Sequence, residues 1–337
     1  MEGGILMRKI LGVVLAIFFS ITFIACKENK EHSKNDLEQV DLVLDWYPNA
    51  VHSFIYTAIE KGYYKDEGLK VNIKFPSNAT DPLALVASKK ATIGMYYLQD
   101  LITSKTNEGV PVKSIGAVIQ SPLGVIISLK DKNINKPIDL ENRSVGYSGS
   151  PLSEAMVREM VKYDGGNPNK VNLMDVGFDI ISSMTTKKVD ATTSGMVNHE
   201  VPVMKHQGFD VNYFYPCDYG IPNYYELVFI ANDQTINNNP KLLKKFLKAS
   251  KKGFEYVKEH EDEGLDILLD NQKQDNFPLT KSVEKQSLDI LTPKMETKEK
   301  KFLQQDDSVW ENNIDWLYKN NLIKTKTKVN DLFINMD

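Results

Sequence analysis

The stretch VDLVLDWYPNAVHSFIYTAIEKGYY, residues 40–64, begins as an apolar strand and ends as a helix. Gly and Ser would be enough to make a plain turn between such elements. This turn instead contains an acid, two aromatic rings, a proline, an amide and an imidazole: Asp45, Trp46, Tyr47, Pro48, Asn49 and His52. The stretch therefore predicts the first strand–helix unit of an α/β fold, with a turn whose side chains can make contacts.

Strand and helix patterns alternate through the rest of the chain in two series. Such alternation predicts an α/β fold with mostly parallel sheets. The second series begins near Lys136, and two apolar segments, 123–129 and 224–232, stand at the joins between the series. We therefore expect two lobes connected by a hinge. Lobe 1 would comprise residues 39–127 and 229–337, and lobe 2 residues 128–228.

Some of the expected elements bear on a binding site. Residues 52–64 read as one helix, residues 224–232 as one continuous strand, and residues 198–208 as a short helix broken by Pro202. The amphipathic helices near the C-terminus are expected to return to lobe 1. A ligand of such a protein would lie in the cleft, beyond the carboxyl ends of the strands.

The N-terminus has the pattern of a lipoprotein signal peptide. Arg8 and Lys9 precede an apolar run over residues 10–25, and Cys26 follows it. We expect residues 1–26 to be the signal peptide and residues 27–38 a flexible spacer. Cys26 would carry the lipid that anchors the protein outside the cytoplasm, on the bacterial cell membrane. An uncleaved membrane anchor is the alternative, because the run is close to the shortest spanning length.

Composition narrows the classes of function. The net charge is −4 without a dense Lys/Arg stripe, so we expect no nucleic-acid partner. If Cys26 carries lipid, Cys217 is the one remaining thiol, which excludes an internal disulfide and a Cys-based metal cluster. His199, Glu200 and His206 lack the H-E-x-x-H spacing of a zinc site. We assign no metal, cofactor or catalytic residue and expect a monomer.

Several motifs resemble a known family. They are LDWYPNAVHSFIYTAIEKGYYKDEGLKV, DPLALVASKKATIGM, KPIDLENRSVGYSGSP, VDATTSGMVNHE and PNYYELVFIAND, in this order. Together they resemble the solute-binding proteins of ABC importers for pyrimidine precursors of thiamine, which are related to the fungal thiamine-pyrimidine synthase. The resemblance implies a periplasmic-binding-protein-like type II fold, a heterocyclic small-molecule ligand and an ABC permease as partner.

The turn after the first strand is the first candidate site. Trp46 can stack on a heteroaromatic ring, and Asn49 offers both a donor and an acceptor. Asp45 lies beside them, and His52, at the start of the helix, could reach a polar substituent of the ring. In the alternative interpretation, Trp46 and Tyr47 pack on the core while Asn49 and His52 cap the helix.

Glu226 is the strongest single candidate. It stands in the otherwise apolar YYELVFI, where a carboxylate is costly unless it is paired. One carboxylate can accept from both the exocyclic amine and the protonated ring nitrogen of a 4-aminopyrimidine, and the resemblance implies the same contact. A buried ion pair with Lys or Arg is the alternative. Tyr224, two residues earlier, would share its strand face and form a second ring wall.

The remaining candidates are assigned from their places at strand ends. Tyr96 is a third aromatic, or ordinary core. Ser148 precedes a helix start and could bind a polar group, whereas helix capping explains its neighbour Ser150 equally well. Of Asn198 and Glu200, one is expected to reach the cleft while the other caps the helix.

Two rival functions remain open from the sequence. The synthase relative consumes one of its own histidines together with pyridoxal phosphate, and His52 falls in the corresponding loop. However, the synthase carries a Cys-rich run that this chain lacks. Among binding proteins, readers of riboflavin, sulfonate or nitrate are alternatives, but Asp45 and Glu226 would repel an anion. The sequence does not distinguish a hydroxymethyl from a formylaminomethyl arm on the pyrimidine.

Overall fold

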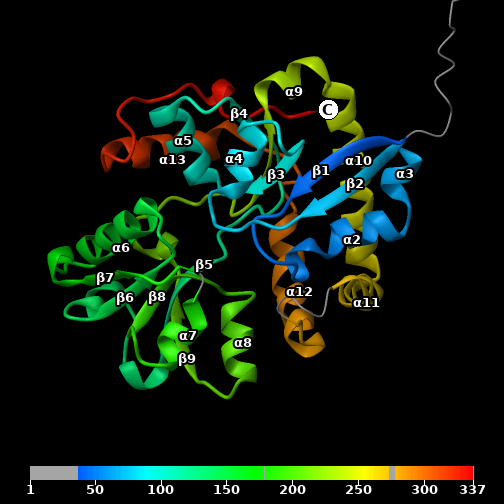
Figure 1. The fold of residues 1–337 in the computed structure, drawn as a ribbon. Helices are drawn as coiled ribbons and strands as arrows, with labels where there is room; N and C mark the ends of the chain where they lie inside the picture. The colour runs from blue at the N-terminus through cyan, green and yellow to red at the C-terminus, as the bar shows by residue number, and fades with distance from the viewer. Residues whose placement is uncertain (1–36, 178, 273–277, 337) are drawn as a thin grey trace, which may run out of the picture. The chain divides into compact units, whose positions relative to one another are not determined.

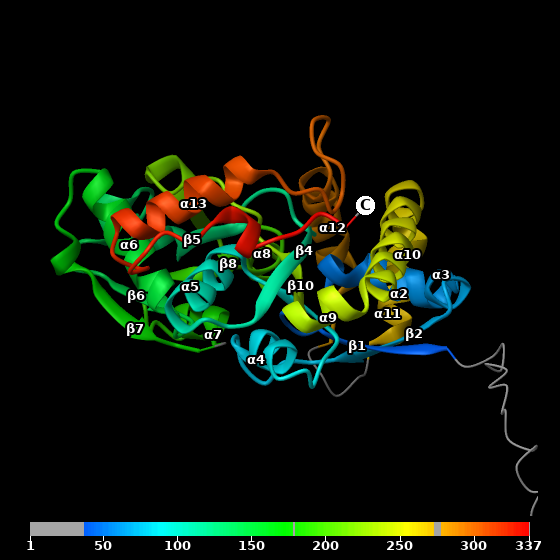
Figure 2. The same ribbon diagram turned by 90° about the horizontal axis from the view of Figure 1, so that it is seen from above.

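The computed structural model describes residues 37–177, 179–272 and 278–336. Within these residues the strands form two five-stranded sheets, each flanked by helices (Figure 1, Figure 2). The expected signal peptide and the lipidation site Cys26 lie outside the described residues. So does nearly all of the expected spacer, whose last residue, Glu38, already belongs to the first strand.

The first sheet has the strand order β2-β1-β3-β10-β4. Its strands are β1 (Glu38–Val43), β2 (Leu69–Lys74), β3 (Ile93–Tyr96), β4 (Val112–Ala117) and β10 (Val228–Asn232). Strand β1 pairs in parallel with β2 and β3, whereas β10 pairs antiparallel with both β3 and β4. Four strands therefore run in one direction, and β10 runs against them.

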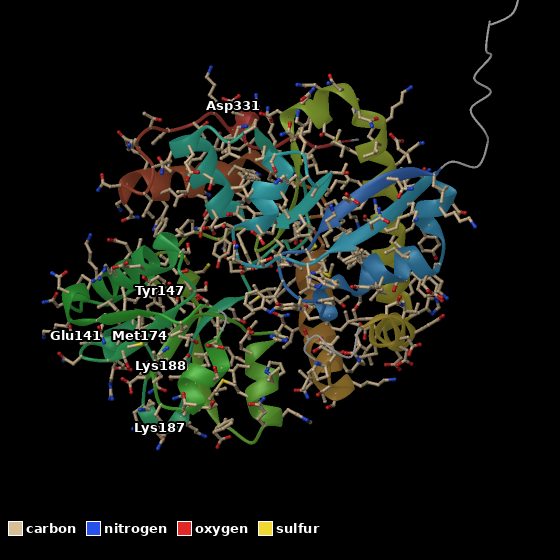
Figure 3. The ribbon with its side chains drawn as sticks, viewed as in Figure 1. Glu141, Tyr147, Met174, Lys187, Lys188 and Asp331 are labelled. Carbon is tan, nitrogen blue, oxygen red and sulfur yellow. The ribbon has the colours of Figure 1, made fainter. Side chains whose placement is uncertain are left out.

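The second sheet repeats this arrangement with the order β7-β6-β8-β5-β9. Its strands are β5 (Gly124–Leu129), β6 (Ser144–Tyr147), β7 (Asn172–Asp175), β8 (Ala191–Met196) and β9 (Val211–Phe214). Here β5 is the antiparallel strand, between β8 and β9. Tyr147 on β6 and Met174 on β7 are among its side chains labelled in Figure 3. We call the first sheet with its helices the first half of the molecule, and the second sheet with its helices the second half.

The α/β fold class expected from the alternating strands and helices is confirmed. The strands next to the two chain crossings differ from the expectation of mostly parallel sheets. Each half contains one antiparallel strand, and these strands, β5 and β10, directly follow the two chain crossings, residues 118–123 and 215–227. The expected boundary after residue 127 falls inside β5, and every residue of β5 belongs to the second sheet.

The segment 224–232 is a strand only in its second part. Strand β10 begins at Val228, so Tyr224 and Glu226 stand in the irregular segment before it, which corrects their expected place within the strand. Within β10, Val228 and Ile230 belong to one hydrophobic cluster, and Phe229 and Ala231 to the other. The strand is thus buried on both faces, as in sheets covered by helices on each side.

Helices cover both halves. Those associated with the first half are α2 (Ser53–Glu60), α3 (Tyr63–Asp66), α4 (Asp81–Ala87), α5 (Leu98–Glu108), α9 (Asp233–Asn238), α10 (Pro240–Glu259), α11 (Glu261–Asn271) and α13 (Asp307–Lys319). Those of the second half are α6 (Pro151–Tyr163), α7 (Ile180–Thr185) and α8 (Glu200–His206). Helices α2 and α10 pack so closely that a Cβ on Gly253 would lie 2.2 Å from the Phe54 carbonyl oxygen.

Two expected helices differ from the structure. The helix over residues 52–64 is divided into a 3₁₀ turn, η1 (Ala50–His52), then α2 and α3, because Gly62 adopts φ +75° between the two helices. Helix α8 is not broken at Pro202. The proline is the third residue of that helix, where a backbone N–H would have no partner within the helix.

Helix α12 (Lys281–Met295) contacts both halves. It packs against η1, which follows the first strand, and against α8 of the second half (Figure 1). Among the described residues, no helix combines the length and apolar character needed to cross a membrane.

Candidate ligand-binding cavity

A cavity of about 520 Å³ is lined by residues of both halves. Much of its lining comes from the carboxyl ends of β1, β3, β6 and β8 and from the segments that follow them. Because β5 and β10 run antiparallel to their neighbours, the segments before these two strands reach the same edges. This topology brings Gly124 and Glu226 into the cavity wall.

The turn after β1 is held by a network of hydrogen bonds around His52. The backbone N–H of Asn49 donates to His52 Nδ1 over 3.2 Å, so the ring proton lies on Nε2, which donates to Asp45 Oδ1 over 3.0 Å. His52 is fully buried and does not line the cavity, whereas Asp45, Trp46 and Asn49 do. The expectation that His52 reaches a ligand is therefore corrected: it positions Asp45 from behind.

The amide of Asn49 is largely committed to the turn. Its Oδ1 accepts from the Val51 N–H over 3.0 Å, and its Nδ2 donates to the Tyr47 carbonyl over 3.1 Å. The helix-capping alternative is thus realised by Asn49 and His52, which together form the capping box of η1, and Asn49 lines the cavity as well. The neighbouring Ala50 N–H donates to the buried Glu284 of α12 over 2.7 Å, which ties the turn to that helix.

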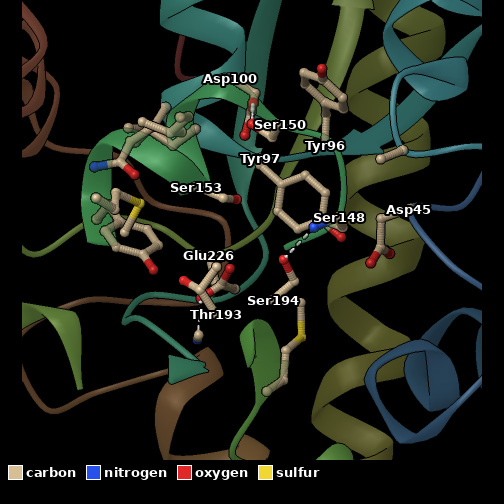
Figure 4. A pocket seen from close by; sticks show the side chains of 18 of the residues that line it. Asp45, Tyr96, Tyr97, Asp100, Ser148, Ser150, Ser153, Thr193, Ser194 and Glu226 are labelled. Atoms are coloured by element: carbon tan, nitrogen blue, oxygen red, sulfur yellow. Dashed lines mark hydrogen bonds between the residues drawn. The ribbon is translucent and has the colours of Figure 1, made fainter. Parts of the chain in front are cut away.

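Aromatic rings line the cavity. Trp46, Tyr96 and Tyr224, expected from the sequence, are all among the lining residues. Tyr97 joins them and is seen with Tyr96 in Figure 4. The Tyr96 and Tyr97 ring centroids lie 5.9 Å apart. Burial and the nearby carboxylates of Asp45 and Glu226 raise the pKa of Tyr97 well above its usual value, so the phenol stays protonated. The sequence analysis missed Tyr97, although the first residue beyond a strand commonly faces such a site.

Glu226 is anchored by backbone donors. The N–H groups of Leu123 and Gly124 both donate to its Oε2, over 2.6 and 2.9 Å, and Oε1 receives neither bond. Burial raises the pKa of Glu226, these two donors oppose the rise, and Asp45 adds to it. The alternative of a direct ion pair is not realised, because no salt bridge within 4.0 Å joins Glu226 to a described Lys, Arg or His. Lys294 acts on it only at longer range.

Hydroxyl groups from the second half also line the cavity. They belong to Ser148, Ser150, Ser153, Thr193 and Ser194 (Figure 4). Ser194 Oγ accepts from the Ser148 N–H over 3.0 Å, and Ser150 Oγ donates to Asp100 Oδ1 over 3.2 Å. Burial raises the pKa of Asp100 to about 6, and the Ser150 bond counteracts the rise. Asp100, on α5 of the first half, was not foreseen, because in sequence it is an ordinary acid in the first turn of a helix.

Asn198 and Glu200 both line the cavity, so the expected division between one ligand contact and one helix cap does not hold. Asn198 is fully buried. Its Nδ2 donates to Ser287 Oγ of α12 over 3.1 Å, and its Oδ1 has no hydrogen-bond partner among the described residues. Glu200 Oε2 accepts from the Met196 N–H over 2.7 Å, while the helix-cap position belongs to His199.

His199 carries positive charge next to Glu200. Its Nδ1 lies 2.7 Å from Glu200 Oε1. Burial by itself would lower the pKa of His199, but the Glu200 carboxylate outweighs burial and raises that pKa to about 9. The same pair holds the pKa of Glu200 below its usual value, against the effect of burial.

The cavity is acidic. Five of its lining residues carry a carboxylate, none is Lys or Arg, and the carboxylates belong to Asp45, Asp100, Glu108, Glu200 and Glu226. A wall of this charge attracts cations and repels anions. Among the described residues, no three His, Cys, Asp or Glu side chains are grouped so as to hold a metal ion.

Comparisons with known proteins agree with this architecture. The family model "NMT1/THI5 like" matches residues 49–264. The chain belongs to this family. It is 41% identical, over 96% of its length and 97% of the relative's, to a formylaminopyrimidine-binding protein of Halalkalibacterium halodurans.

Two further similarities have lower sequence identity. A 4-amino-5-hydroxymethyl-2-methylpyrimidine phosphate synthase of Candida albicans is 29% identical to this family member, over 66% of the chain and 68% of the synthase. The alkanesulfonate-binding protein SsuA of Xanthomonas axonopodis superposes with a TM-score of 0.70 at 10% identity, covering 89% of this chain and 99% of that one. The last likeness establishes the two-lobed fold of periplasmic binding proteins.

Proposed function

We propose that this protein is the extracytoplasmic solute-binding component of an ABC importer, and that it captures a pyrimidine precursor of thiamine, with formylaminopyrimidine as the first candidate. The observation that carries the proposal is a backbone-anchored carboxylate, Glu226, in an acidic cavity with aromatic walls. The near full-length similarity to a formylaminopyrimidine-binding protein supports it.

The cavity suits a flat heterocycle with N–H donors. Trp46, Tyr97 and Tyr224 offer ring faces, and an aromatic stack contributes about 0.5–1.5 kcal/mol beyond burial. With Oε2 of Glu226 held by two backbone N–H groups, Oε1 is the better acceptor for a ligand. A protonated aminopyrimidine would place its ring N–H and its exocyclic amine on this carboxylate, as a charge-assisted pair.

Ligand capture would proceed by closure of the two halves around the cavity. Residues from both halves line it, so a bound ligand would contact both and favour the closed arrangement. Crossing segments 118–123 and 215–227 would supply the hinge. Delivery to a permease, anchoring through lipid on Cys26 and a monomeric state complete the proposal.

A synthase activity is less well supported. The resemblance implies that the synthase consumes one of its own histidines, for which His52 would be the candidate in this chain. Here His52 is fully buried, bonded at both ring nitrogens, and outside the cavity lining. This arrangement favours a structural role for His52 and a binding function for the protein.

A thermal-shift screen of the full-length chain tests the proposal. The panel contains formylaminopyrimidine, hydroxymethylpyrimidine, thiamine, riboflavin, taurine and nitrate. A ligand that binds only the folded state at a hundred times its Kd stabilises that state by about 2.7 kcal/mol, which raises the melting temperature measurably. We expect a shift with formylaminopyrimidine. A shift with riboflavin, taurine or nitrate and none with either pyrimidine would contradict the proposed ligand.

A further inference from the structure

Ser150 stands at a helix start but does not cap its helix. It occupies the N-cap position of α6, yet its side chain makes no capping hydrogen bond there. Its Oγ donates instead to Asp100 Oδ1, on the first turn of α5, over 3.2 Å (Figure 4). An N-cap serine normally satisfies a free N–H of its own helix, so this side chain is committed to another contact.

That contact joins the two halves of the molecule. Helix α5 follows β3 of the first sheet, and α6 follows β6 of the second. Neither Asp100 nor Ser150 lies in a crossing segment, and both line the cavity. The other polar contacts near the cavity that link the halves, from Asn198 to Ser287 and from Leu123 and Gly124 to Glu226, involve α12 or the crossings.

The position of Asp100 carries an electrostatic cost. Its carboxylate is part-buried near Tyr96 and Tyr97, and no described Lys or Arg lines the cavity. A carboxylate that leaves water is costly unless a donor replaces the lost hydrogen bonds. The Ser150 hydroxyl is such a donor, and it belongs to the other half of the molecule.

We propose that Asp100 and Ser150 form the latch that holds the two halves closed over a bound ligand, with the Ser150 hydroxyl offsetting the cost of burying the Asp100 carboxylate. Ser150 is a positioning residue in this role, because it acts through Asp100. The proposal rests on the proposed function in one respect, namely that the ligand occupies this cavity.

The latch predicts a change in the rate of ligand release. With the full-length chain and formylaminopyrimidine as probe, stopped-flow fluorescence of Trp46, which lines the cavity, reports kon and koff. In Ser150→Ala, loss of a hydrogen bond to a charged group should raise koff about tenfold, with kon nearly unchanged. Asp100→Asn keeps an acceptor and removes the buried charge, so it provides a background in which Ser150 no longer bonds to a charged group.

The chain offers a matched control. Ser144 Oγ donates to Asp190 Oδ2 over 3.0 Å, which is the same kind of bond, but both residues belong to the second half and neither lines the cavity. Ser144→Ala should leave koff unchanged. In the Asp100→Asn background, Ser150→Ala should have a much smaller effect than in the wild type. Equal koff values for Ser150→Ala and Ser144→Ala would overturn the latch, as would an effect of Ser150→Ala that is equally large in the wild type and in the Asp100→Asn background.

A second measurement needs no ligand and so separates the latch from the proposed function. Hydrogen–deuterium exchange of the full-length chain is followed over residues 98–104 of α5. Ser150→Ala, although it lies in the other half, should accelerate exchange there, while Ser144→Ala should not. If the wild type binds no pyrimidine, the proposed function fails, but the exchange measurement still tests the latch. Exchange over residues 98–104 that is equally fast in Ser150→Ala and in the wild type would overturn the latch.

Discussion

The two halves of this protein share one strand order but present different chemistry to the cavity. In each, three parallel strands are followed by the antiparallel strand and then a fourth, as β2-β1-β3-β10-β4 and β7-β6-β8-β5-β9. The ends of β1 and β3 contribute acids and aromatic rings, whereas the ends of β6 and β8 contribute mainly hydroxyls, with one amide and one ion pair. The same backbone positions thus carry different side-chain types.

This difference suggests that the halves divide ligand recognition and closure between them. Rings and carboxylates of the first half, with Glu226 from the crossing, have the chemistry to recognise a flat, cationic heterocycle. The neutral hydroxyls of the second half make weaker bonds and can adapt to either donors or acceptors. We infer that the first half and the crossing supply most of the binding free energy, and that the second half supplies closure.

The largest effect is expected at Glu226. Glu226→Gln keeps the shape but removes the charge, and loss of a charged hydrogen bond (about 1.5–3 kcal/mol) should weaken binding of formylaminopyrimidine well over tenfold. Calorimetric titration measures the Kd. Asp190→Asn, another carboxylate that accepts a backbone N–H but lies outside the cavity lining, is the control and should leave the Kd unchanged. An unchanged Kd in Glu226→Gln would remove the assigned role.

The next effect is expected at Trp46. Trp46→Ala removes a ring face from the first half, which should weaken binding by about tenfold, or about 1.4 kcal/mol. Trp46→Phe should recover most of the affinity, because a smaller aromatic face remains. If the alanine variant bound as tightly as the wild type, Trp46 would be a packing residue, and the proposed division between the halves would lose its main support.

A pH effect of smaller size is expected in the second half. In the folded protein the pKa of His199 is about 9, above its ordinary value of 6.5. The ion pair with Glu200 therefore makes its full contribution to the free energy of unfolding below pH 6.5. This stability is lost as the pH rises through 9. Because the side chain is 23% exposed, we expect a loss on the order of 1 kcal/mol. Urea unfolding between pH 6 and 10 should show this loss of unfolding free energy in the wild type and not in His199→Gln. The same pH dependence of the unfolding free energy in both proteins would contradict the ion pair.

The smallest effect is expected at a hydroxyl of the second half. Ser194→Ala removes the acceptor of the Ser148 N–H, a neutral hydrogen bond that contributes about 0.5–1.5 kcal/mol. Binding should therefore weaken by only a few-fold. A loss as large as that of Glu226→Gln would reverse the proposed ranking of the halves.

Local patterns in the sequence predicted much of the fold. The alternation of strands and helices gave both α/β series, and an acid in an apolar run singled out Glu226, although the residue proved to precede β10. Predictions failed where tertiary contacts decide. His52 satisfies both ring nitrogens within its own turn, and Asp100 receives its hydrogen bond from Ser150, which lies at the start of α6 in the other half. No spacing along the chain reveals such a contact.

The central claim is that the Glu226 carboxylate accepts a hydrogen bond from the amino group of a pyrimidine. A calorimetric cycle tests it most directly, with wild type and Glu226→Gln each titrated with formylaminopyrimidine and with its analogue lacking the 4-amino group. If the two groups interact, removing the amine should weaken binding to the wild type strongly and to Glu226→Gln only slightly. Equal losses in both proteins would contradict the claim.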